Sequence, residues 1–240
     1  MSELSGKVHP ERSSAAQDDH QRAAVDALQL GDWMASDKLP EMIATRQQRS
    51  LRTACALIEA GRTLLVDRAL DDLAVEMVCE RAGTTVGAFY GRFENKHAYF
   101  VTLQRIHVIQ AEALLFQLQR KRGRDDDDLQ AICREMVDTA VRPFRNNVGV
   151  LRASLQHTQE GMWQPFKALG DRFRTTLSAR ISPLLTHIPP RHRDLRIRFA
   201  YQAMAGTLVH SALNNPGPLA LDDDALSREL LRLVYGYLTA

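Results

Sequence analysis

The sequence predicts an all-α protein, and three observations support that fold class. Apolar residues recur at spacings of three and four along most of the chain, as Leu51, Ala54 and Ile58 illustrate. No segment shows the sustained alternation of apolar and polar residues that marks a half-buried strand. Glycine and proline residues separate the periodic segments and supply the breaks between helices.

Length and composition allow one large domain or two modest ones. The chain has 240 residues, of which 45% are hydrophobic and 25% are charged, as in ordinary globular proteins. Lysine and arginine number 31 against 29 aspartates and glutamates, so the net charge is only +2. That balance excludes a polycation but leaves room for a small basic face that binds DNA. The three cysteines stand far apart in apolar helical patterns, which favours buried free thiols over a zinc site.

Residues 1–45 form an N-terminal extension that is partly disordered by its composition. The first residues are polar, and a loose helix and a turn are expected to follow as far as Leu39, with Gly31 as the stop of that helix. The periodicity becomes strong from Pro40, a residue that suits the first turn of a helix. We expect the resulting helix to end at Gly61.

Further helices are expected to follow to the C-terminus. They cover residues 73–82, 85–91, 94–118, 129–142, 148–159, 166–184, 195–213 and 225–238. Pro143 is expected to end the helix that begins at residue 129, and Asp222 or Asp223 is expected to cap the last one.

Two short predicted helices joined by Gly83 and Thr84 have the proportions of a helix-turn-helix. Glycine at this point lets the chain turn sharply. Thr85 can cap the second of these helices and offer its hydroxyl or backbone N–H to a phosphate. The first turn of that helix consists of the small residues Val86, Gly87 and Ala88, which would let its backbone sit deep in a major groove.

Aromatic and basic residues divide between the two sides of the same helix. Phe89 and Phe93, four residues apart, are expected to pack inward, whereas Tyr90 points to the opposite side with a hydroxyl suited to a phosphate oxygen. Arg92 and Lys96 place positive charge on that exposed flank. The aromatic stripe alone would fit a helical hairpin in a core, but the polar residues opposite it predict DNA binding.

The segment from Arg81 to Lys96 resembles the signature of the tetracycline-repressor (TetR) family of bacterial regulators. It shares the Ala-Gly turn, the Gly-x-x-Tyr-x-x-Phe core and the lysine three residues further on. The helical face of residues 51–61 is similar to the first helix of that family's DNA-binding domain, so the close resemblance covers residues 46–107. Beyond it only the all-helical layout agrees, including two long C-terminal helices of the kind that pair subunits in the family.

The resemblance implies a set of DNA contacts and shows one departure. Residues 73–92 would be the helix-turn-helix proper, and Tyr90 and Lys96 would contact phosphates. The full set of candidate DNA-binding residues is Arg46, Arg49, Thr84, Thr85, Val86, Gly87, Ala88, Tyr90, Arg92 and Lys96. The family often has serine or threonine where Ala74 stands, so Asp72 becomes the candidate cap, although its charge would not help at a DNA surface.

The C-terminal region contains adaptable methionines and several aromatic residues that are suited to line a cavity. The candidate ligand-binding residues are Phe116, Met136, Phe144, His157, Met162, Trp163 and Phe166. The expected guest is a small hydrophobic or aromatic effector in an apolar cavity that touches the C-terminal half of the helix at 94–118. The alternative is that these side chains simply fill the core.

Other classes of function lack their residues. No Ser/His/Asp set, phosphate loop or paired carboxylates stands out for catalysis, and the histidines have no ligand spacing, so neither an enzyme nor a metal or cofactor site is expected. No apolar run has the length of a signal peptide or a membrane span, which predicts a cytoplasmic protein without a membrane partner.

The predicted architecture is an N-terminal three-helix DNA-binding domain over residues 46–107, joined by a long helix to a helical ligand-binding and dimerisation domain over residues 108–240. A stripe on the last helix would serve both the core and a partner subunit, and Leu230 is expected at an outward position of it. Its residues are Leu226, Leu230, Leu233, Val234 and Tyr237. The expected function is a homodimeric transcriptional repressor that a small molecule releases from a palindromic operator in double-stranded DNA. A ligand-independent architectural or partner-regulated DNA-binding protein of the same fold is the alternative, and activation instead of repression stays open.

Overall fold

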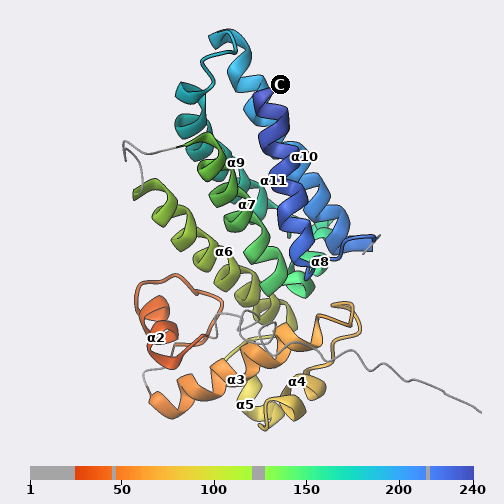
Figure 1. Cartoon of the computed structure of the whole chain (residues 1–240). Coiled ribbons are helices and arrows are strands. Elements are labelled where there is room, and N and C mark those ends of the chain that lie inside the picture. The colour runs from red at the N-terminus through yellow and green to blue at the C-terminus, as the bar shows by residue number, and fades with distance from the viewer. Residues whose placement is uncertain (1–24, 45–46, 121–127, 215–216) are drawn as a thin grey trace, which may run out of the picture.

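The computed structural model describes residues 25–44, 47–120, 128–214 and 217–240, and within these ranges every regular element is a helix. The elements are α2 (Ala27–Ala35), α3 (Gln48–Leu64), α4 (Val75–Arg81), α5 (Val86–Tyr90), α6 (Lys96–Arg120), α7 (Leu129–Asn146), α8 (Val148–Gln156), η1 (Thr158–Glu160), α9 (Gln164–Ile181), η2 (Ser182–Leu184), α10 (Pro190–Asn214) and α11 (Asp224–Thr239). Figure 1 shows α2 to α5 gathered at one end, the bundle of α7 to α11 above them, and α6 running from one group into the other. The predicted all-α fold is confirmed.

Aromatic rings form the centre of the core at the α2–α5 end. The ring centroids of Phe89, Phe93 and Tyr99 lie 5.0 to 5.3 Å apart, and none of these side chains is exposed. The Tyr99 hydroxyl donates to the carbonyl of Leu57 in α3 at 2.6 Å and fills the space that a side chain at Gly61 would need. The predicted end of α3 at Gly61 is therefore wrong, because this glycine permits close packing within a helix that continues past it.

The N-terminal extension contributes to the same core. Asp26 caps α2 by accepting from the backbone N–H groups of Leu28 and Gln29, both at 2.8 Å. α2 then runs straight through Gly31, so the predicted stop there is wrong. Four extension residues are buried in this core: Val25, Leu30, Leu39 and Met42. The expected disorder at the start of the chain falls outside the described residues.

Residues 40–44 form a turn and an isolated bridge, not a helix, so the predicted helix start at Pro40 is wrong. Met42 forms an isolated antiparallel bridge with Phe93, and the N–H of Ile43 donates to the carbonyl of Arg92 at 2.8 Å. These backbone groups pair with the chain after α5 and are not available for a helical ladder. This pairing holds the N-terminal extension against the residues that follow α5.

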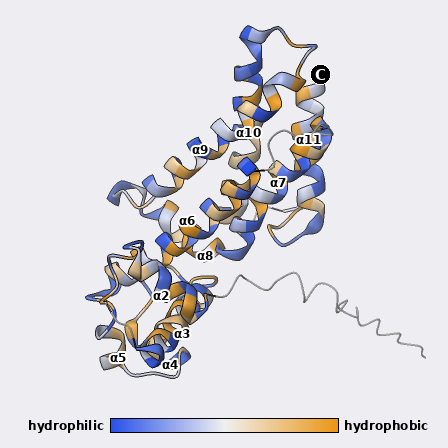
Figure 2. Cartoon of the chain, turned by 90° about the vertical axis from the view of Figure 1, so that its left-hand side faces the viewer, coloured by the Kyte–Doolittle hydropathy of each residue, from blue (hydrophilic) through white to orange (hydrophobic). Residues whose placement is uncertain are grey.

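The second core lies among α7, α9, α10 and α11, whose apolar faces turn towards one another (Figure 2). α7 continues through Pro143, and the predicted stop before it is wrong. The turn beyond the proline is held by Arg145, whose guanidinium donates to the carbonyls of Leu221 at 2.6 Å and Asp223 at 2.8 Å. Asp223 caps α11 through the N–H of Ala225 at 2.7 Å, as predicted. None of the described helices is long and apolar enough to cross a membrane.

Candidate DNA interface and effector pocket

The turn between α4 and α5 depends on Gly83, whose φ of +62° lies in the left-handed region that favours glycine. The next N–H, that of Thr84, donates to the carbonyl of Cys79 at 2.9 Å and closes the end of α4. Thr85 then caps α5, because its hydroxyl accepts from the N–H of Ala88 at 3.1 Å. At the other end of α4 the cap position is Ala74 and no side chain caps the helix, so the expected Asp72 cap is wrong.

One side of α5 faces solvent at the end of the molecule farthest from the tops of α10 and α11 (Figure 1). Thr85 and Gly87 are exposed, and half of the Tyr90 side chain is exposed, whereas Phe89 is fully buried on the opposite side. The other candidate residues at this end of α5 are half-buried, namely Thr84, Val86 and Ala88. The expected division into an inward aromatic side and an outward polar side is present.

Two of the candidate cations are held by backbone carbonyls. Arg92 donates from Nε to Ser50 at 3.0 Å and from Nη1 to Ala88 at 2.5 Å, and its burial lowers the pKa of the guanidinium. Lys96 donates from Nζ to the carbonyls of Leu70 at 3.0 Å and Asp71 at 3.2 Å. Arg92 therefore ties the end of α5 to the first turn of α3, and Lys96 holds the loop that precedes α4. Both cations also place positive charge beside α5.

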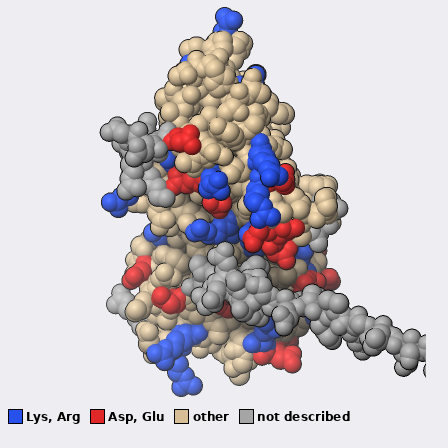
Figure 3. Space-filling model, viewed as in Figure 1, with Lys and Arg blue, Asp and Glu red and all other residues tan. Residues whose placement is uncertain are grey.

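The start of α3 supplies further positive charge next to α5. Arg49 is exposed in its first turn, and Arg52, which the sequence analysis did not select, is exposed three residues later. Figure 3 shows basic side chains projecting from the lower edge of the molecule, where α3 begins. Arg46 falls outside the described residues.

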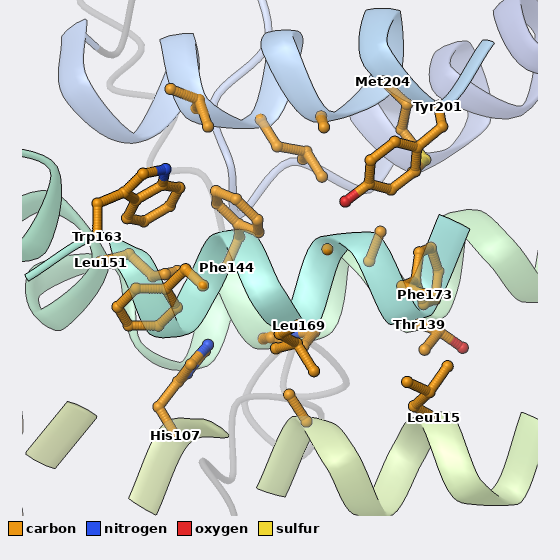
Figure 4. A pocket seen from close by; sticks show the side chains of 18 residues that line it. His107, Leu115, Thr139, Phe144, Leu151, Trp163, Leu169, Phe173, Tyr201 and Met204 are labelled. Carbon is orange, nitrogen blue, oxygen red and sulfur yellow. The ribbon is translucent and has the colours of Figure 1, made fainter. Parts of the chain in front are cut away.

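A pocket of about 130 Å³ lies between α6, α7, α8, α9 and α10 (Figure 4). It is lined by His107, Ala111, Leu115, Thr139, Ala140, Pro143, Phe144, Leu151, Trp163, Phe166, Leu169, Gly170, Phe173, Tyr201, Met204, Ala205, Leu208 and Val209. It touches the C-terminal half of α6, which is where the sequence predicts a cavity. No group of three or more metal-ligating side chains occurs among the described residues.

His107 is the polar group that distinguishes this apolar pocket. Its ring points from α6 towards the cavity (Figure 4), and its Nδ1 is buried without a hydrogen-bond partner in the part of the chain that the structure describes. Burial and, to a smaller extent, the nearby Arg62 guanidinium together lower the pKa of His107 to about 3, so the ring is neutral at pH 7. The Tyr201 hydroxyl points into the same space from α10 (Figure 4).

Three of the seven candidate ligand-binding residues line this pocket, namely Phe144, Trp163 and Phe166. Phe116 instead is 58% exposed on the far side of α6. Met136 is buried in the second core, and Met162 is buried in the first. His157 lies outside the pocket, with its Nδ1 2.9 Å from a carboxylate oxygen of Glu160 and its Nε2 3.7 Å from a carboxylate oxygen of Asp71.

The sequence analysis missed the pocket residues His107, Leu151 and Tyr201. His107 stands within an apolar helical stripe, and a histidine there is usually a core residue that has found a partner. The polarity of His107 on an apolar helix face was the one sign in the sequence that it could have a special role. Whether its ring has a hydrogen-bond partner depends on the tertiary structure. Leu151 and Tyr201 have no distinguishing local pattern.

The pocket is joined to the α2–α5 end through α8. Leu151 lines the pocket, and its neighbour Arg152 donates to the carbonyls of Leu65 at 2.8 Å and Val66 at 2.6 Å, just after the last turn of α3. Gly149 lies so close to Leu65 that a Cβ would overlap its carbonyl group. A movement of α8 therefore has to move the end of α3 or break these contacts.

A second link between the two ends runs through buried polar groups. Gln104 of α6 donates from Nε2 to the Ser154 hydroxyl at 2.7 Å and to the Met162 carbonyl at 3.0 Å. Arg62 of α3 is paired with Glu59 at 2.8 Å and reaches the carbonyl of Asn146 at the end of α7. α3, α6, α7 and α8 are thus tied together beside His107.

Comparisons with known proteins agree with this arrangement. Residues 57–101 match the family described as "Bacterial regulatory proteins, tetR family", and residues 128–238 match "Tetracyclin repressor-like, C-terminal domain". The first match contains α4, α5 and most of the aromatic core, and the second contains α7 to α11 apart from the last residue of α11. A search of curated proteins finds no match.

Solved structures with the same fold include three transcriptional regulators. One from Rhodococcus sp. RHA1, described as TetR-like, has a TM-score of 0.57 and 16% identity and covers 81% of this chain and 100% of its own. One from Aquifex aeolicus VF5, described as TerR/AcrR family, has a TM-score of 0.56 and 13% identity and covers 75% and 96%. One of the tetR family from Streptomyces coelicolor has a TM-score of 0.53 and 15% identity and covers 77% and 78%. With its exposed helix-turn-helix face and these matches to both halves, the chain belongs to the tetracycline-repressor (TetR) family and is a DNA-binding transcriptional regulator.

Proposed function

We propose that the protein is a homodimeric repressor that leaves a palindromic operator when a small apolar or aromatic effector occupies the pocket between α6 and α10. The observation that carries this proposal is the position of the pocket. It lies against α6 and α8, and both helices contact α3 of the DNA-binding end. Occupation of the pocket is therefore coupled by packing to the orientation of α5.

The proposed dimer surface is the outer face of α10 and α11. Leu195 and Phe199 on α10 and Leu233 on α11 are exposed, and the Phe199 ring lies 5.3 Å from that of Tyr237. Figure 3 shows few charged side chains on the upper part of the molecule, where α10 and α11 lie. Exposed apolar residues on two adjacent helices favour association with a second copy through the same surface.

One residue expected at that surface lies elsewhere. Leu230 is only 2% exposed and belongs to the second core, so its predicted outward position is wrong. The helical phase of α11 places Leu230 and Val234 inward, whereas Leu233 points outward with 44% of its side chain exposed. Leu233 is therefore the residue of this stripe that is suited to contact a partner.

In the proposed complex each subunit inserts the exposed side of α5 into a major groove. Half-sites of the operator would lie about 34 Å apart, one turn of DNA. Tyr90, Arg49 and the third donor of the Lys96 ammonium group are the proposed phosphate contacts, and Gly87 and Ala88 allow the close approach to bases. These contacts would fix the docking of each subunit.

Release follows if the effector binds one conformer more tightly than the other. A ligand with equal affinity for both conformers shifts nothing, so the effector must favour an arrangement of α6 and α8 with the wrong spacing between the two α5 helices. We place the boundary between the DNA-binding and regulatory domains at residues 107 and 108, within α6, with residues 1–45 as the extension. The cytoplasm, where DNA is available, is the proposed location.

The pocket favours this function over the ligand-independent alternative, in which the C-terminal bundle would be a closed dimerisation device. The decisive experiment has two steps. First, operator DNA is selected from a genomic library with the full-length protein, and the stoichiometry is measured by sedimentation. Then operator binding is measured by fluorescence anisotropy against a panel of small aromatic compounds. Two subunits per palindrome and loss of affinity with at least one compound are expected; a monomer on DNA, or no release by any compound, contradicts the proposal.

A further inference from the structure

We infer that the pocket selects an uncharged, single-ring aromatic compound whose hydroxyl group hydrogen-bonds to the imidazole of His107. The inference rests on the proposed effector site and specifies the chemistry of its occupant. Three properties of the pocket support it: a buried polar atom without a partner, a lining without charge, and a volume that matches one ring.

The first property is the state of His107. The side chain is 3% exposed, its ring stands 5.3 Å from that of Phe166, and its Nδ1 has no hydrogen-bond partner among the residues that the structure describes. A buried polar atom left unpaired is unfavourable, so a guest that supplies the missing partner gains affinity. A hydroxyl group both donates and accepts, and therefore suits either tautomer of a neutral imidazole.

The second property is the absence of charge from the pocket lining. Apart from His107, the lining residues are apolar or carry neutral polar groups, namely the hydroxyls of Thr139 and Tyr201 and the indole N–H of Trp163. Burial keeps His107 unprotonated because it lowers the pKa of the ring to about 3. The nearby Arg62 guanidinium does not line the pocket and is already paired with Glu59 at 2.8 Å. A carboxylate or ammonium guest would lose its hydration here without gaining a counter-charge.

The third property is the shape of the space. An apolar cavity of about 150 Å³ is known to hold benzene, and the pocket measures about 130 Å³. Trp163 and Phe166 are stacked at one side, with centroids 4.9 Å apart and planes 27° from parallel. The Tyr201 hydroxyl enters from the α10 side, opposite His107 (Figure 4). A flat ring fits between these walls with its hydroxyl at His107.

The test measures binding of phenol, benzene and benzoate to the full-length protein without DNA, by competition in equilibrium dialysis and by calorimetry. We expect phenol to bind, benzoate to bind at least about tenfold more weakly, and the ratio of phenol to benzene affinity to depend on His107. In His107→Leu that ratio should fall about tenfold, and in His107→Asn, which restores a donor and an acceptor, most of it should return. His97→Ala, a substitution of an exposed histidine on the same helix, is the matched control and should change neither affinity.

Circular dichroism on each variant shows that the fold is retained. The inference is overturned if phenol does not bind, if benzoate binds as tightly as phenol, or if His107→Leu leaves the phenol to benzene ratio unchanged. Release of operator DNA is measured separately on the same samples. Selective phenol binding without DNA release would contradict the proposed repressor mechanism and still support the inferred chemistry of the pocket.

Discussion

Gly149 at the start of α8 packs directly on the carbonyl group of Leu65 at the end of α3, in a contact that no larger residue could make. A Cβ at this position would overlap that carbonyl and lie 2.7 Å from the backbone N of Val66. Because the obstacle is backbone and not a flexible side chain, the neighbouring helix would have to move. This contact joins α8, which lines the pocket through Leu151, to the end of α3 in the DNA-binding end.

Gly149→Ala should therefore destabilise the protein and alter operator affinity. Overpacking against backbone costs about 1–3 kcal/mol, which lowers the melting temperature by several degrees. Gly87→Ala is the control for the melting temperature alone, because Gly87 belongs to the proposed DNA interface. A Cβ there would meet only the Thr85 hydroxyl oxygen at 3.9 Å and should leave the melting temperature unchanged or slightly higher. Equal melting temperatures for Gly149→Ala and the wild type, in calorimetry, would contradict the close contact.

Arg152 holds the same junction through charge-assisted hydrogen bonds to Leu65 and Val66. Arg152→Met keeps much of the aliphatic bulk but removes the donors, so unfolding by denaturant should become easier by about 1–2 kcal/mol. The effect of an effector on operator affinity should also weaken, because a movement of α8 would no longer be transmitted to the end of α3 through these hydrogen bonds. Arg134→Met, at an exposed position on α7, is the matched control. Unchanged stability and unchanged release together would contradict the role of Arg152.

Two of the proposed phosphate contacts, Tyr90 and Lys96, should differ in their effect on stability. Tyr90→Phe removes only the hydroxyl group of a half-exposed side chain, so it should weaken DNA binding without changing the melting temperature. Lys96→Ala should lower the slope of log affinity against log salt by about one unit. It should also lower the melting temperature, because Lys96 holds the carbonyls of Leu70 and Asp71. Anisotropy titrations at several salt concentrations test both; a salt slope that Lys96→Ala leaves unchanged argues against a phosphate contact.

Dimerisation should depend on the exposed residues of α10 and α11. Phe199→Glu and Leu233→Glu place a charge on the proposed surface and should give folded monomers with weak operator affinity. Leu28→Glu, at a position on α2 that is 71% exposed, should remain dimeric. Sedimentation at micromolar concentration distinguishes the outcomes, and folded dimers of both surface variants would rule out this face. Leu230→Glu is unsuitable, since it would bury a charge in the second core.

His107 should make stability depend on pH. Burial lowers its pKa to about 3 in the folded protein, from an ordinary value of 6.5, so below pH 6.5 the unfolded chain takes up a proton that the folded chain does not. Stability is therefore lost as the pH falls. Between pH 7 and pH 5 the free energy of unfolding should fall by about 2 kcal/mol more in the wild type than in His107→Leu. This difference corresponds to about 1.4 kcal/mol for each pH unit below 6.5. Urea unfolding at both pH values measures this difference. An equal fall in the free energy of unfolding of the two proteins would show that His107 is not held neutral by burial in the folded protein.

The sequence by itself determined the all-α fold, the positions of most helices and the helix-turn-helix. These features follow from local rules: apolar spacing, the turn at Gly83, the cap at Thr85, and the opposed Phe89 and Tyr90. Each depends on residues within a few positions of one another, so the pattern is visible in one dimension.

Only the tertiary structure decided how Gly61, Pro143, Leu230 and His107 are used. Gly61 and Pro143 look like helix ends, yet both helices continue past them. The Tyr99 ring packs against α3 at Gly61, and Arg145 holds the last turn of α7 after Pro143. Leu230 faces the core because neighbouring helices surround α11 on that side, and His107 faces a pocket because residues from five helices leave space there. Such outcomes depend on contacts between residues far apart in the chain, and the preferences of single segments do not contain them.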